Sequence, residues 1–499
     1  MRYLPDGNWM QKADEHTIQN IGIASIVLME RAALRVVEFL ETYQLDTSKT
    51  LIVCGAGNNG GDGFAIARLL KQQGKNVCAV FIGKEERRST QCQLQMEIAE
   101  KIGVPIVTAL PKEEYTVITD AIFGVGLSRE IQGEYAKVLE QLNAMSGQKV
   151  AVDIPSGICS KTGKVLGIAF RAKWTVSFAC EKLGTVLFPG CDYAGEVLVA
   201  EIGIDPAFFK DRKEVCYTLD REDLERLLPA RSANSHKGTY GKVLMIVGSK
   251  GMAGAAYLSA KAAYISGAGL VQIYTHESNR MILQQLLPEA IISTYTTYEA
   301  TQLHSLLNWA DVVCIGCGIG VTDVARKIVE DVIQLGTCPC VVDADGLNLL
   351  SENLSILKGV KRELVLTPHM KEMSRLLGCS IEELSKQRFQ LLQEFVEKYG
   401  VVCALKDART IVAEKEHSPF VNTAGNSAMA KAGSGDVLAG TIAGFLAQRM
   451  NGYEGAVLGV YLHACGGDDA RNVCGQYSVL AEDLLEGIKY CIASTKKGR

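Results

Sequence analysis

The sequence contains no apolar run long enough to cross a bilayer, and residues 1–14 lack the hydrophobic segment of an export signal. Charge of either sign is not in excess: 52 Lys and Arg stand against 56 Asp and Glu, a net charge of −4, which gives no electrostatic case for binding nucleic acid or anionic membrane. Only 11 prolines occur, and low-complexity runs are absent, which argues against disorder. We therefore expect a cytoplasmic globular protein with small-molecule partners, without nucleic acid or membrane partners, and forming a homo-oligomer through apolar helices in both halves.

Cysteine, in contrast, is plentiful at 16 residues. The cysteines are scattered through strand-like apolar runs, and without an export signal this distribution indicates reduced core thiols. Cys314 and Cys317 have the spacing of metal ligands, but no second CxxC motif or His pair accompanies them. A buried strand end explains this pair better than a zinc site does.

A chain of 499 residues is long for a single core, and charged, turn-rich sequence at 205–235 interrupts its regular pattern. We place the boundary near Cys216, with domains at 1–215 and 216–499. In the first domain, a long helix at about 14–43, with a possible break near Gly22, precedes alternating strand-like runs and helical stretches. This alternation predicts a Rossmann-like, doubly wound parallel sheet. The runs are 51–54, 77–82, 117–118, 150–154, 175–178 and 197–200.

The same alternation restarts in the second half, before helices dominate from residue 432 onward. It predicts a second α/β/α sandwich, so the fold class is α/β with two domains. The strand-like runs here are 243–247, 270–274, 312–315, 341–342, 364–366 and 401–405.

A glycine-rich turn, Ala432-Gly433-Ser434-Gly435-Asp436, opens an apolar helical run. Backbone N–H groups at such a helix start bind anions. A carboxylate beside them suits phosphoryl transfer, because it can take the proton of an attacking hydroxyl. From these five residues alone, a helix-capping role for Asp436 explains the pattern equally well.

Three loops of the first half follow strand-like runs: GAGNNGGDG at 55–63, DAIFGVGL at 120–127 and VDIPSG at 152–157. They are expected at the carboxyl edge of one sheet, where open α/β sheets bind ligands. The glycines of the first loop allow close approach to a phosphate. However, the run 77–82 is not followed by the acidic residue of a nicotinamide-ribose site, and the loop lacks the Gly-Lys-Ser/Thr of a P-loop.

Asn59, Asp120 and Ser156, one from each loop, together offer oxygen ligands with a single formal charge. This composition suits a hard, weakly bound cation. Each residue alone is better explained as a turn or capping residue. The convergence of three loops on one edge favours the cation.

These loops, with the preceding Met29-Glu30-Arg31, resemble the epimerase domain that interconverts the two epimers of hydrated NADH and NADPH, and the likeness covers most of residues 10–205. The resemblance implies that Asp153 transfers the proton and that Asn59, Asp120 and Ser156 bind K⁺. The residues implied to line the hydrated-nucleotide site are Asn58, Asn59, Gly60, Gly61, Asp62, Gly124, Val125, Gly126, Leu127, Ser128, Arg129, Glu130, Tyr135 and Asp153.

Four loops of the second half also carry suitable chemistry: the glycine-rich turns 248–254 and 316–320, the TPHMKE run 367–372, and the loop 406–410. The last of these offers two cations and a hydroxyl to a nucleotide phosphate. Taken alone, Lys406 would be a solvated loop lysine and His369 a capping or core histidine.

In their order, and with HKGTYG at 236–241 and the run 426–440, these loops resemble the ADP-dependent dehydratase of hydrated NAD(P)H, a ribokinase-like fold, over about 220–490. In that family ADP phosphorylates the C6 hydroxyl of the hydrated ring, and loss of phosphate restores the nicotinamide and leaves AMP. The resemblance implies Asp436 as the base, the amides of residues 433–435 as the anion hole, and Mg²⁺ at the site. The hydrated nucleotide would contact Ala253, Gly318, His369 and Asp436. ADP would contact Lys406, Asp407, Ala408, Arg409, Thr410, Asn426, Gly433, Ser434 and Gly435.

Two positions depart from the family's usual pattern. Lys406-Asp407 stands where Lys-Gly is common, and Asn426-Ser427-Ala428 stands where Asn-Pro-Gly is common. A carboxylate near a diphosphate weakens nucleotide binding unless it points to water. Asp407 is therefore expected to lower ADP affinity unless it is turned away or neutralised.

The sequence thus predicts a bifunctional repair enzyme: an epimerase of the R and S hydrates of NADH and NADPH, fused to an ADP-dependent dehydratase of the S epimer. A small-molecule kinase, for a sugar or a vitamin precursor, shares the Gly-Ser-Gly-Asp motif but leaves the cation-binding loops unexplained. A non-catalytic nucleotide sensor leaves Asp153 and Asp436 without a role.

Overall fold

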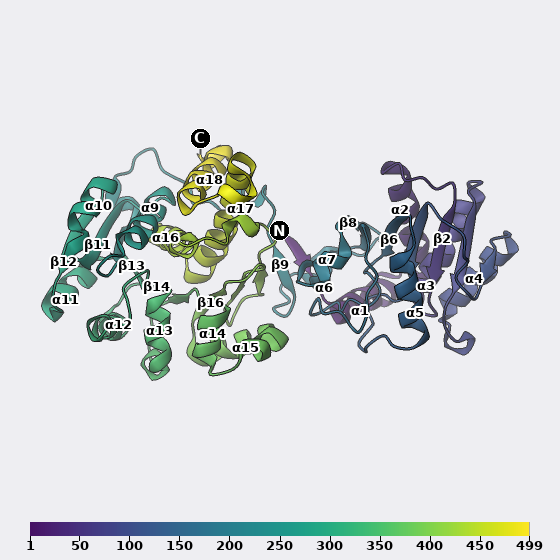
Figure 1. Ribbon diagram of the computed structural model, residues 1–499, viewed down its shortest axis with the longest axis horizontal. Helices are drawn as coiled ribbons and strands as arrows, with labels where there is room; N and C mark the ends of the chain where they lie inside the picture. The colour runs from purple at the N-terminus through teal and green to yellow at the C-terminus, as the bar shows by residue number, and fades with distance from the viewer. Residues whose placement is uncertain (499) are drawn as a thin grey trace. The chain divides into compact units, whose positions relative to one another are not determined.

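The computed structural model describes residues 1–498 and consists of two compact units, Arg2–Tyr217 and the chain from Thr218 onward, with Met1 grouped with the second. Among these residues, no helix combines the length and the apolar character needed to cross a membrane. Each unit is built around one sheet with helices on both faces (Figure 1). The predicted α/β class is confirmed.

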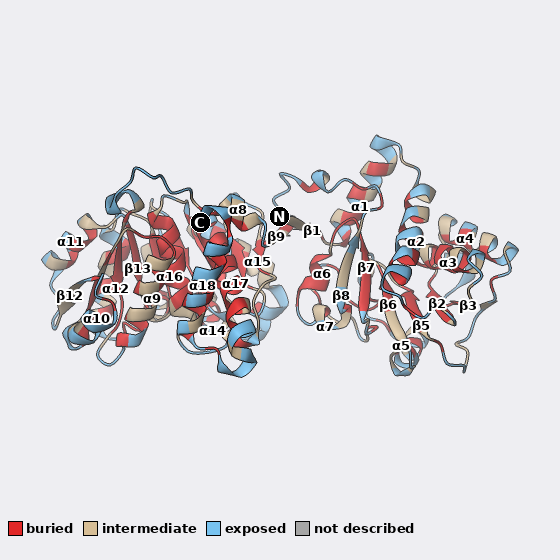
Figure 2. Cartoon of the chain, turned by 90° about the horizontal axis from the view of Figure 1, so that it is seen from above, coloured by how far each residue is buried: buried red, intermediate tan, exposed pale blue. Residues whose placement is uncertain are grey.

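The sheet of the first unit is parallel throughout, in the order β4-β3-β2-β5-β6-β7-β8. All five residues of β2, β5 and β7 are buried, as expected of strands covered by helices on both faces (Figure 2). The edge strand β4 has only 2 residues, a run too short for the sequence pattern to have indicated it. The strands are β2 (Thr50–Cys54), β3 (Val77–Phe81), β4 (Ile106–Val107), β5 (Val117–Ala121), β6 (Gln148–Val152), β7 (Trp174–Phe178) and β8 (Glu196–Ala200).

This strand order reverses between β2 and β5. From β2 the chain winds outward through β3 and β4, and then returns to β5 on the other side of β2. The two strands stay in register to their ends, where the N–H of Gly55 donates to the carbonyl of Ala121 at 3.0 Å. In open α/β sheets, ligands bind beside such a reversal of strand order.

The long N-terminal helix expected at 14–43 is two helices, and it begins earlier than predicted. Asp6 caps α1 by accepting a hydrogen bond from the N–H of Trp9 at 3.0 Å. A π-helical turn, Thr17–Ile21, follows α1. Gly22 (φ +88°) then ends the helical segment, at the position where the sequence predicts a possible break. The helices of this unit are α1 (Gly7–His16), α2 (Ser25–Thr42), α3 (Asn58–Gln72), α4 (Thr90–Lys101), α5 (Glu134–Ala144), α6 (Leu183–Val186) and α7 (Gly190–Ala194).

The sheet of the second unit contains the run β18-β17-β16-β15-β14-β13-β10-β11-β12, parallel from β12 to β16 and antiparallel beyond. The sequence pattern missed β12 because its residues are only partly buried at the sheet edge. The strands are β10 (Lys242–Ile246), β11 (Leu270–His276), β12 (Ile291–Tyr295), β13 (Val312–Ile315), β14 (Cys340–Val342), β15 (Leu364–Leu366), β16 (Val402–Leu405), β17 (Ile411–Ala413) and β18 (Phe420–Val421). The chain also forms β1 (Arg2–Leu4) and β9 (Cys216–Thr218).

A second reversal of strand order lies between β10 and β13. The loops after these strands touch: the N–H of Gly248 donates to the carbonyl of Cys317 at 2.9 Å, and that of Ser249 donates to the carbonyl of Gly318 at 2.6 Å. The loops after β14, β15 and β16 reach the same edge, because parallel strands all end there.

A nearly all-buried helix, α16, lies against α9 in this unit (Figure 2). A Cβ at Gly440 would stand 2.0 Å from the carbonyl oxygen of Ser259, so glycine permits the close approach of the two helices. The helices are α8 (Asp223–Leu227), α9 (Ala253–Ile265), α10 (Arg280–Leu286), α11 (Ala300–Trp309), α12 (Asp323–Leu335), α13 (Asp345–Glu352), α14 (Met370–Leu377), α15 (Ile381–Tyr399), α16 (Ser434–Ala447), α17 (Gly452–Ser478) and α18 (Ala481–Ser494).

Candidate active sites

The first unit contains a cavity of about 710 Å³, a volume suited to a small-molecule ligand. It is lined by parts of α1 and α2, by the loops after β2 and β5, and by the residues that follow β6. The structure brings together here most of the residues expected at the first site. Those that line the cavity are Asn58, Asn59, Asp62, Gly124, Val125, Gly126, Leu127, Ser128, Arg129, Tyr135 and Asp153.

Three of the expected residues do not line this cavity: Gly60, Gly61 and Glu130. A Cβ at Gly60 would stand 1.8 Å from the carbonyl oxygen of Gly55, and one at Gly61 would stand 2.7 Å from Cε of Met29. Glycine at these two positions therefore allows the tight turn into α3 and its packing. Glu130 is exposed.

Asp153, the expected proton-transfer residue, follows β6 with φ +68°, a conformation that residues other than glycine rarely adopt. Its Oδ1 accepts a hydrogen bond from the N–H of Phe178 at 3.0 Å and forms an ion pair with Lys182. Lys182 is fully buried, and its Nζ also donates to the carbonyl of Phe178 at 2.8 Å and to Oγ of Ser177 at 3.1 Å. This network fixes the Asp153 carboxylate in one orientation at the cavity wall.

Two further carboxyl groups, Asp14 on α1 and Asp62 on α3, line the same cavity. Burial, followed by the charge of Asp153, raises the pKa of Asp14 to about 6. The same two causes raise the pKa of Asp62 well above its usual range. The cavity thus combines one carboxylate paired with an ammonium and two carboxyl groups that hold their protons to higher pH than usual.

Asp120 and Ser156, two of the expected cation ligands, are fully buried and bonded to each other. The N–H and the Oγ of Ser156 donate to Oδ2 and Oδ1 of Asp120, both at 2.7 Å. Burial raises the pKa of Asp120 to about 6, although these hydrogen bonds oppose the shift.

Asn59 completes the expected cation site. Its side chain faces Gly124. The residue before Gly124, Phe123, donates its N–H to Oγ of Ser156 at 2.9 Å, so the loop beside Asn59 is bonded to Ser156. Within residues 1–498, the buried amide nitrogen of Asn59 has no hydrogen-bond partner. Because an amide group can be turned to present its oxygen instead, these side chains fit a weakly held monovalent cation.

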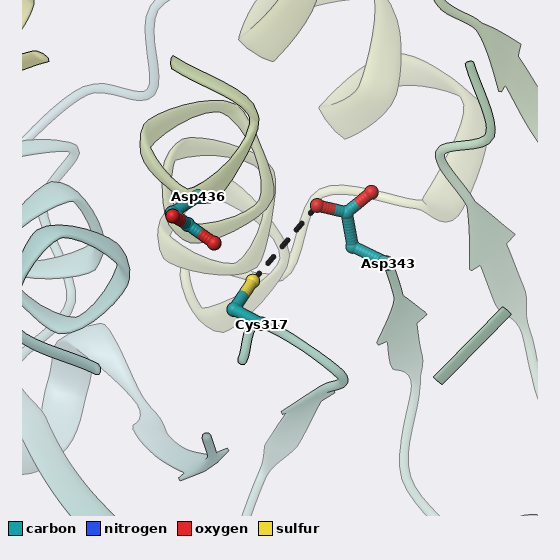
Figure 3. A group of neighbouring side chains, drawn as sticks. All are labelled: Cys317, Asp343 and Asp436. Carbon is teal, nitrogen blue, oxygen red and sulfur yellow. Dashed lines mark hydrogen bonds between the residues drawn. The ribbon is translucent and has the colours of Figure 1, made fainter. Parts of the chain in front are cut away.

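In the second unit, three carboxyl- or thiol-bearing side chains meet at the start of α16. One ligand atom each of Cys317, Asp343 and Asp436 lies within 4.8 Å of the others, and Sγ of Cys317 lies 3.9 Å from Oδ2 of Asp343 (Figure 3). Burial, followed by the charge of Asp343, raises the pKa of Asp436 to about 6. Hydrogen bonding to Cys314 and burial raise the pKa of Cys317 well above its usual range, so the group offers a neutral thiol beside a carboxylate base.

Gly433, with φ +92°, occupies the N-cap of α16, and Asp436 lies in the first turn. Asp436 is therefore not the N-cap residue of this helix, which was the alternative role that its sequence allowed. Lys406 lies close by: a Cβ at Gly435 would stand 3.5 Å from its Nζ and 3.6 Å from Oδ2 of Asp343. The backbone amides at this helix start, the ammonium group of Lys406 and the carboxyl group of Asp436 thus lie close together.

His369 has the capping role that its position allowed. Its Nδ1 accepts hydrogen bonds from the N–H groups of Lys371 and Glu372 at the start of α14, both at 3.1 Å. A carboxylate oxygen of Glu372 accepts from the N–H of His369 at 2.8 Å. Burial and the nearby charge of Lys406 lower the pKa of His369, so the ring is neutral at pH 7.

The sequence predicts that Asp407 lowers ADP affinity unless its charge is turned away or neutralised, and the structure shows an ion pair that neutralises it. Its Oδ2 lies 3.0 Å from Nη1 of Arg388, so the extra carboxylate beside Lys406 is charge-compensated. Arg409 donates to the carbonyl of Thr423 at 3.1 Å, and Thr410 is buried at the start of β17. An ion pair and a hydrogen bond thus tie the loop after β16 to Arg388 and Thr423.

Helix α17 supports the other expected nucleotide residues. Asn426 donates to Oδ1 of Asp468 at 2.8 Å, and Oγ of Ser434 lies 3.3 Å from Nε2 of His463. Burial lowers the pKa of His463 to about 4, so this histidine is neutral. Across the site, Ala253 begins α9, and a Cβ at Gly318 would stand 3.0 Å from Cβ of Ala255.

Comparison with known proteins covers both units. A family profile described as YjeF-related protein N-terminus matches residues 25–184, and one described as NAD(P)H-hydrate dehydratase matches residues 243–489. A bifunctional NAD(P)H-hydrate repair enzyme from Moorella thermoacetica is 35% identical, over 99% of this chain and 97% of that protein. The chain belongs to the family of bifunctional NAD(P)H-hydrate repair enzymes.

Two of the similar solved structures each cover a little over half of the repair enzyme. A ribokinase-like superfamily protein from Enterococcus faecalis is 31% identical, with a TM-score of 0.52 over 56% of this chain and 97% of that one. An ADP/ATP-dependent NAD(P)H-hydrate dehydratase from Bacillus subtilis, co-crystallised with ATP and Mg²⁺, is 29% identical, with a TM-score of 0.48 over 55% of this chain and 96% of that one. The ribokinase-like fold expected of the second unit is confirmed.

Sequence reasoning missed three residues at the two sites of this repair enzyme: Asp14, Lys182 and Asp343. Asp343 directly follows β14, and Lys182 lies four residues after β7, so both stand at carboxyl ends of strands that the pattern did predict. Listing the charged residues at every strand end would have found them. Asp14 gave no such signal, because it lies inside a helix.

Proposed function

We propose that this repair enzyme interconverts the R and S hydrates of NADH and NADPH at the 710 Å³ cavity and dehydrates the S hydrate with ADP at the start of α16. The second reaction would yield NAD(P)H, AMP and phosphate. The juxtaposition of Asp436, Asp343 and Lys406 carries this proposal, because it supplies a base, a cation and helix-start amides at one point.

At the dehydratase site, Asp436 would take the proton of the C6 hydroxyl as its oxygen attacks the β-phosphorus of ADP, with AMP leaving. Amides of residues 433–435 would stabilise the charge on the transferred phosphoryl group. The phosphate ester would then leave from C6 as a proton is lost from the ring, which restores the reduced nicotinamide. Ala253, Gly318 and His369 would position the hydrated nucleotide, and residues 406–410, Asn426 and Ser434 would hold ADP.

Mg²⁺ fits this site in part. Oδ1 of Asp343 already accepts from Thr367 and pairs with Lys406, whereas its Oδ2 remains toward the helix start and offers the hard oxygen that Mg²⁺ prefers. When bound, the ion would neutralise charge on the phosphates of ADP.

At the epimerase site, Asp153 would transfer a proton to or from the oxygen on C6 of the hydrated ring, and Lys182 would hold the Asp153 carboxylate in place. Asn59, Asp120 and Ser156 would hold K⁺, which supplies positive charge next to the nucleotide. The residues 58–62, 124–130 and Tyr135 would line the nucleotide's binding path.

The test is to incubate the protein with the two purified epimers of hydrated NADH, with and without ADP. Recovery of the reduced-nicotinamide absorbance from the S epimer only with ADP, and exchange of the epimers without it, are expected. No recovery with either ADP or ATP would contradict the dehydratase. Consumption of ATP with release of a stable phosphorylated product would indicate a kinase instead.

A further inference from the structure

The first site holds a carboxyl group that the proposed function does not use. Asp14 lines the cavity together with Met10, Gln11 and Ile18 of the same chain segment, at spacings that place it within one face of the helix. A π-helical turn begins at Thr17, immediately after α1. Such turns are rare and are frequent at functional sites.

We infer that Asp14 is a second catalytic residue of the epimerase site, which gives a proton to the departing C6 hydroxyl while Asp153 takes a proton from the incoming water. This inference rests on the proposed epimerase function. It assigns two carboxyl groups from separate elements, α1 and the residue after β6, to the two oxygens that C6 must exchange.

The substrate's chemistry calls for such a pair. C6 of the hydrated ring carries both a hydroxyl and the ring nitrogen. When the C6–O bond breaks, its electron pair goes to oxygen, which takes the proton of Asp14 and leaves as water. The nitrogen lone pair then forms a C=N bond with C6. Addition of water to the other face returns that electron pair to nitrogen, and Asp153 accepts the proton of the added water. The atoms of the substrate are conserved and its configuration is inverted.

The charges around the two groups differ in the direction that these roles require. Asp153 is paired with the buried ammonium of Lys182 and is available as a proton acceptor. Four charged or titratable groups surround Asp14. Asp153 and Lys182 follow strands of the sheet, Asp62 belongs to α3, and Glu15 lies on the same helix as Asp14. Burial is the largest cause of the raised pKa of Asp14, about 6, so this group holds its proton to higher pH than an ordinary aspartate does. A buried carboxyl group with a raised pKa suits the acid, and a carboxylate paired with a buried ammonium suits the base.

One inversion leaves Asp14 ionised and Asp153 protonated, which is the arrangement needed for the reverse inversion. The pair therefore serves both directions of an epimerisation without a change of residues. A site with Asp153 alone would lack the acid on one face.

The test compares Asp14→Asn with Glu15→Gln, which removes the neighbouring, exposed carboxylate of the same helix. Epimer exchange of hydrated NADH is measured without ADP by chromatography, and binding of the hydrate by calorimetry. Asp14→Asn is expected to slow exchange at least about 100-fold with binding changed less than about threefold, whereas Glu15→Gln keeps the wild-type rate. Asp14→Glu should restore part of the rate and shift the pH at which exchange declines on the alkaline side.

The same assay run in H₂¹⁸O follows the bond that breaks. One solvent oxygen is expected at C6 for each inversion. Retention of the original oxygen, or wild-type exchange by Asp14→Asn, would overturn the inference while leaving the epimerase function intact. No exchange by the wild-type protein at all would instead contradict the proposed function.

Discussion

Nζ of Lys406 lies 2.6 Å from Oδ1 of Asp343, a residue that is 1% exposed. Thr367 donates to the same oxygen at 2.7 Å, which fixes the Asp343 carboxylate at the sheet edge. The other oxygen of Asp343 faces the start of α16, where its charge contributes to the raised pKa of Asp436. One ion pair thus positions a cation for phosphate and tunes the base.

Replacing Lys406 by Met should destabilise the second unit by about 3–5 kcal/mol, because it leaves the buried Asp343 carboxylate without its counter-charge. Chemical denaturation of the full chain measures the change. Lys431→Met, which removes an exposed lysine of the same unit, is the control and should change stability by less than about 0.5 kcal/mol. Adding Asp343→Asn to Lys406→Met should recover part of the loss; an equally unstable double variant would contradict this account.

Asp436→Asn should abolish ADP-dependent recovery of NADH, with a loss of at least about 1000-fold, and leave epimer exchange at the wild-type rate. The reason is that the amide cannot take the hydroxyl proton. The matched control is Asp323→Asn, an exposed first-turn aspartate of α12 in the same unit. Loss of both activities in Asp436→Asn would mean that the two sites do not work independently.

The pH dependence of the dehydratase follows from the same residue. Asp436 has a pKa of about 6, so the rate under saturating substrates should rise as pH increases through 6 and then level off. For stability the sign is opposite: a raised carboxyl pKa means that the folded state binds the proton more tightly, and this contribution is lost as pH rises through 6. Asp436→Asn should therefore be more stable than wild type by up to about 3 kcal/mol at pH 8, with no gain at pH 3. A rate independent of pH between 5 and 8 would contradict this role.

Replacing K⁺ by a large organic cation such as tetramethylammonium should lower the epimer-exchange rate, because the Asn59 amide and the Asp120 carboxylate would lose their shared ion. Exchange is measured at constant ionic strength across K⁺ concentrations. Asn59→Ala should remove this dependence, and the ADP-dependent step measured in the same samples serves as the control. Unchanged exchange and unchanged hydrate binding without K⁺ would contradict the assignment.

The extent to which the sites could be predicted depended on the kind of residue. Glycine-rich loops and the residues beside them, such as Asn59 and Asp436, stand out because their spacing reflects backbone constraints that sequence records directly. Lys182 and Asp343 have no such motif; each acts through one partner, Asp153 or Lys406, that lies far away in sequence. The strand order brings those partners together: β6 lies beside β7, and only β15 separates β14 from β16, so the residues after these strands meet at one sheet edge.

Gly60 is predicted from the sequence to line the nucleotide site, whereas the structure shows that it packs against the backbone of Gly55. Its Cβ would stand 1.8 Å from the carbonyl oxygen of Gly55, so Gly60→Ala must move backbone and should destabilise the first unit by about 3 kcal/mol or more. Gly57→Ala is the matched control in the same loop, since φ is −85° and no atom lies within 4 Å of the new Cβ; a change within about 1 kcal/mol is expected. Hydrogen exchange of β2 and α3 reports the stability of this unit separately from the other. Equal protection in the two variants would mean that the loop yields without cost, and that Gly60 instead serves the nucleotide.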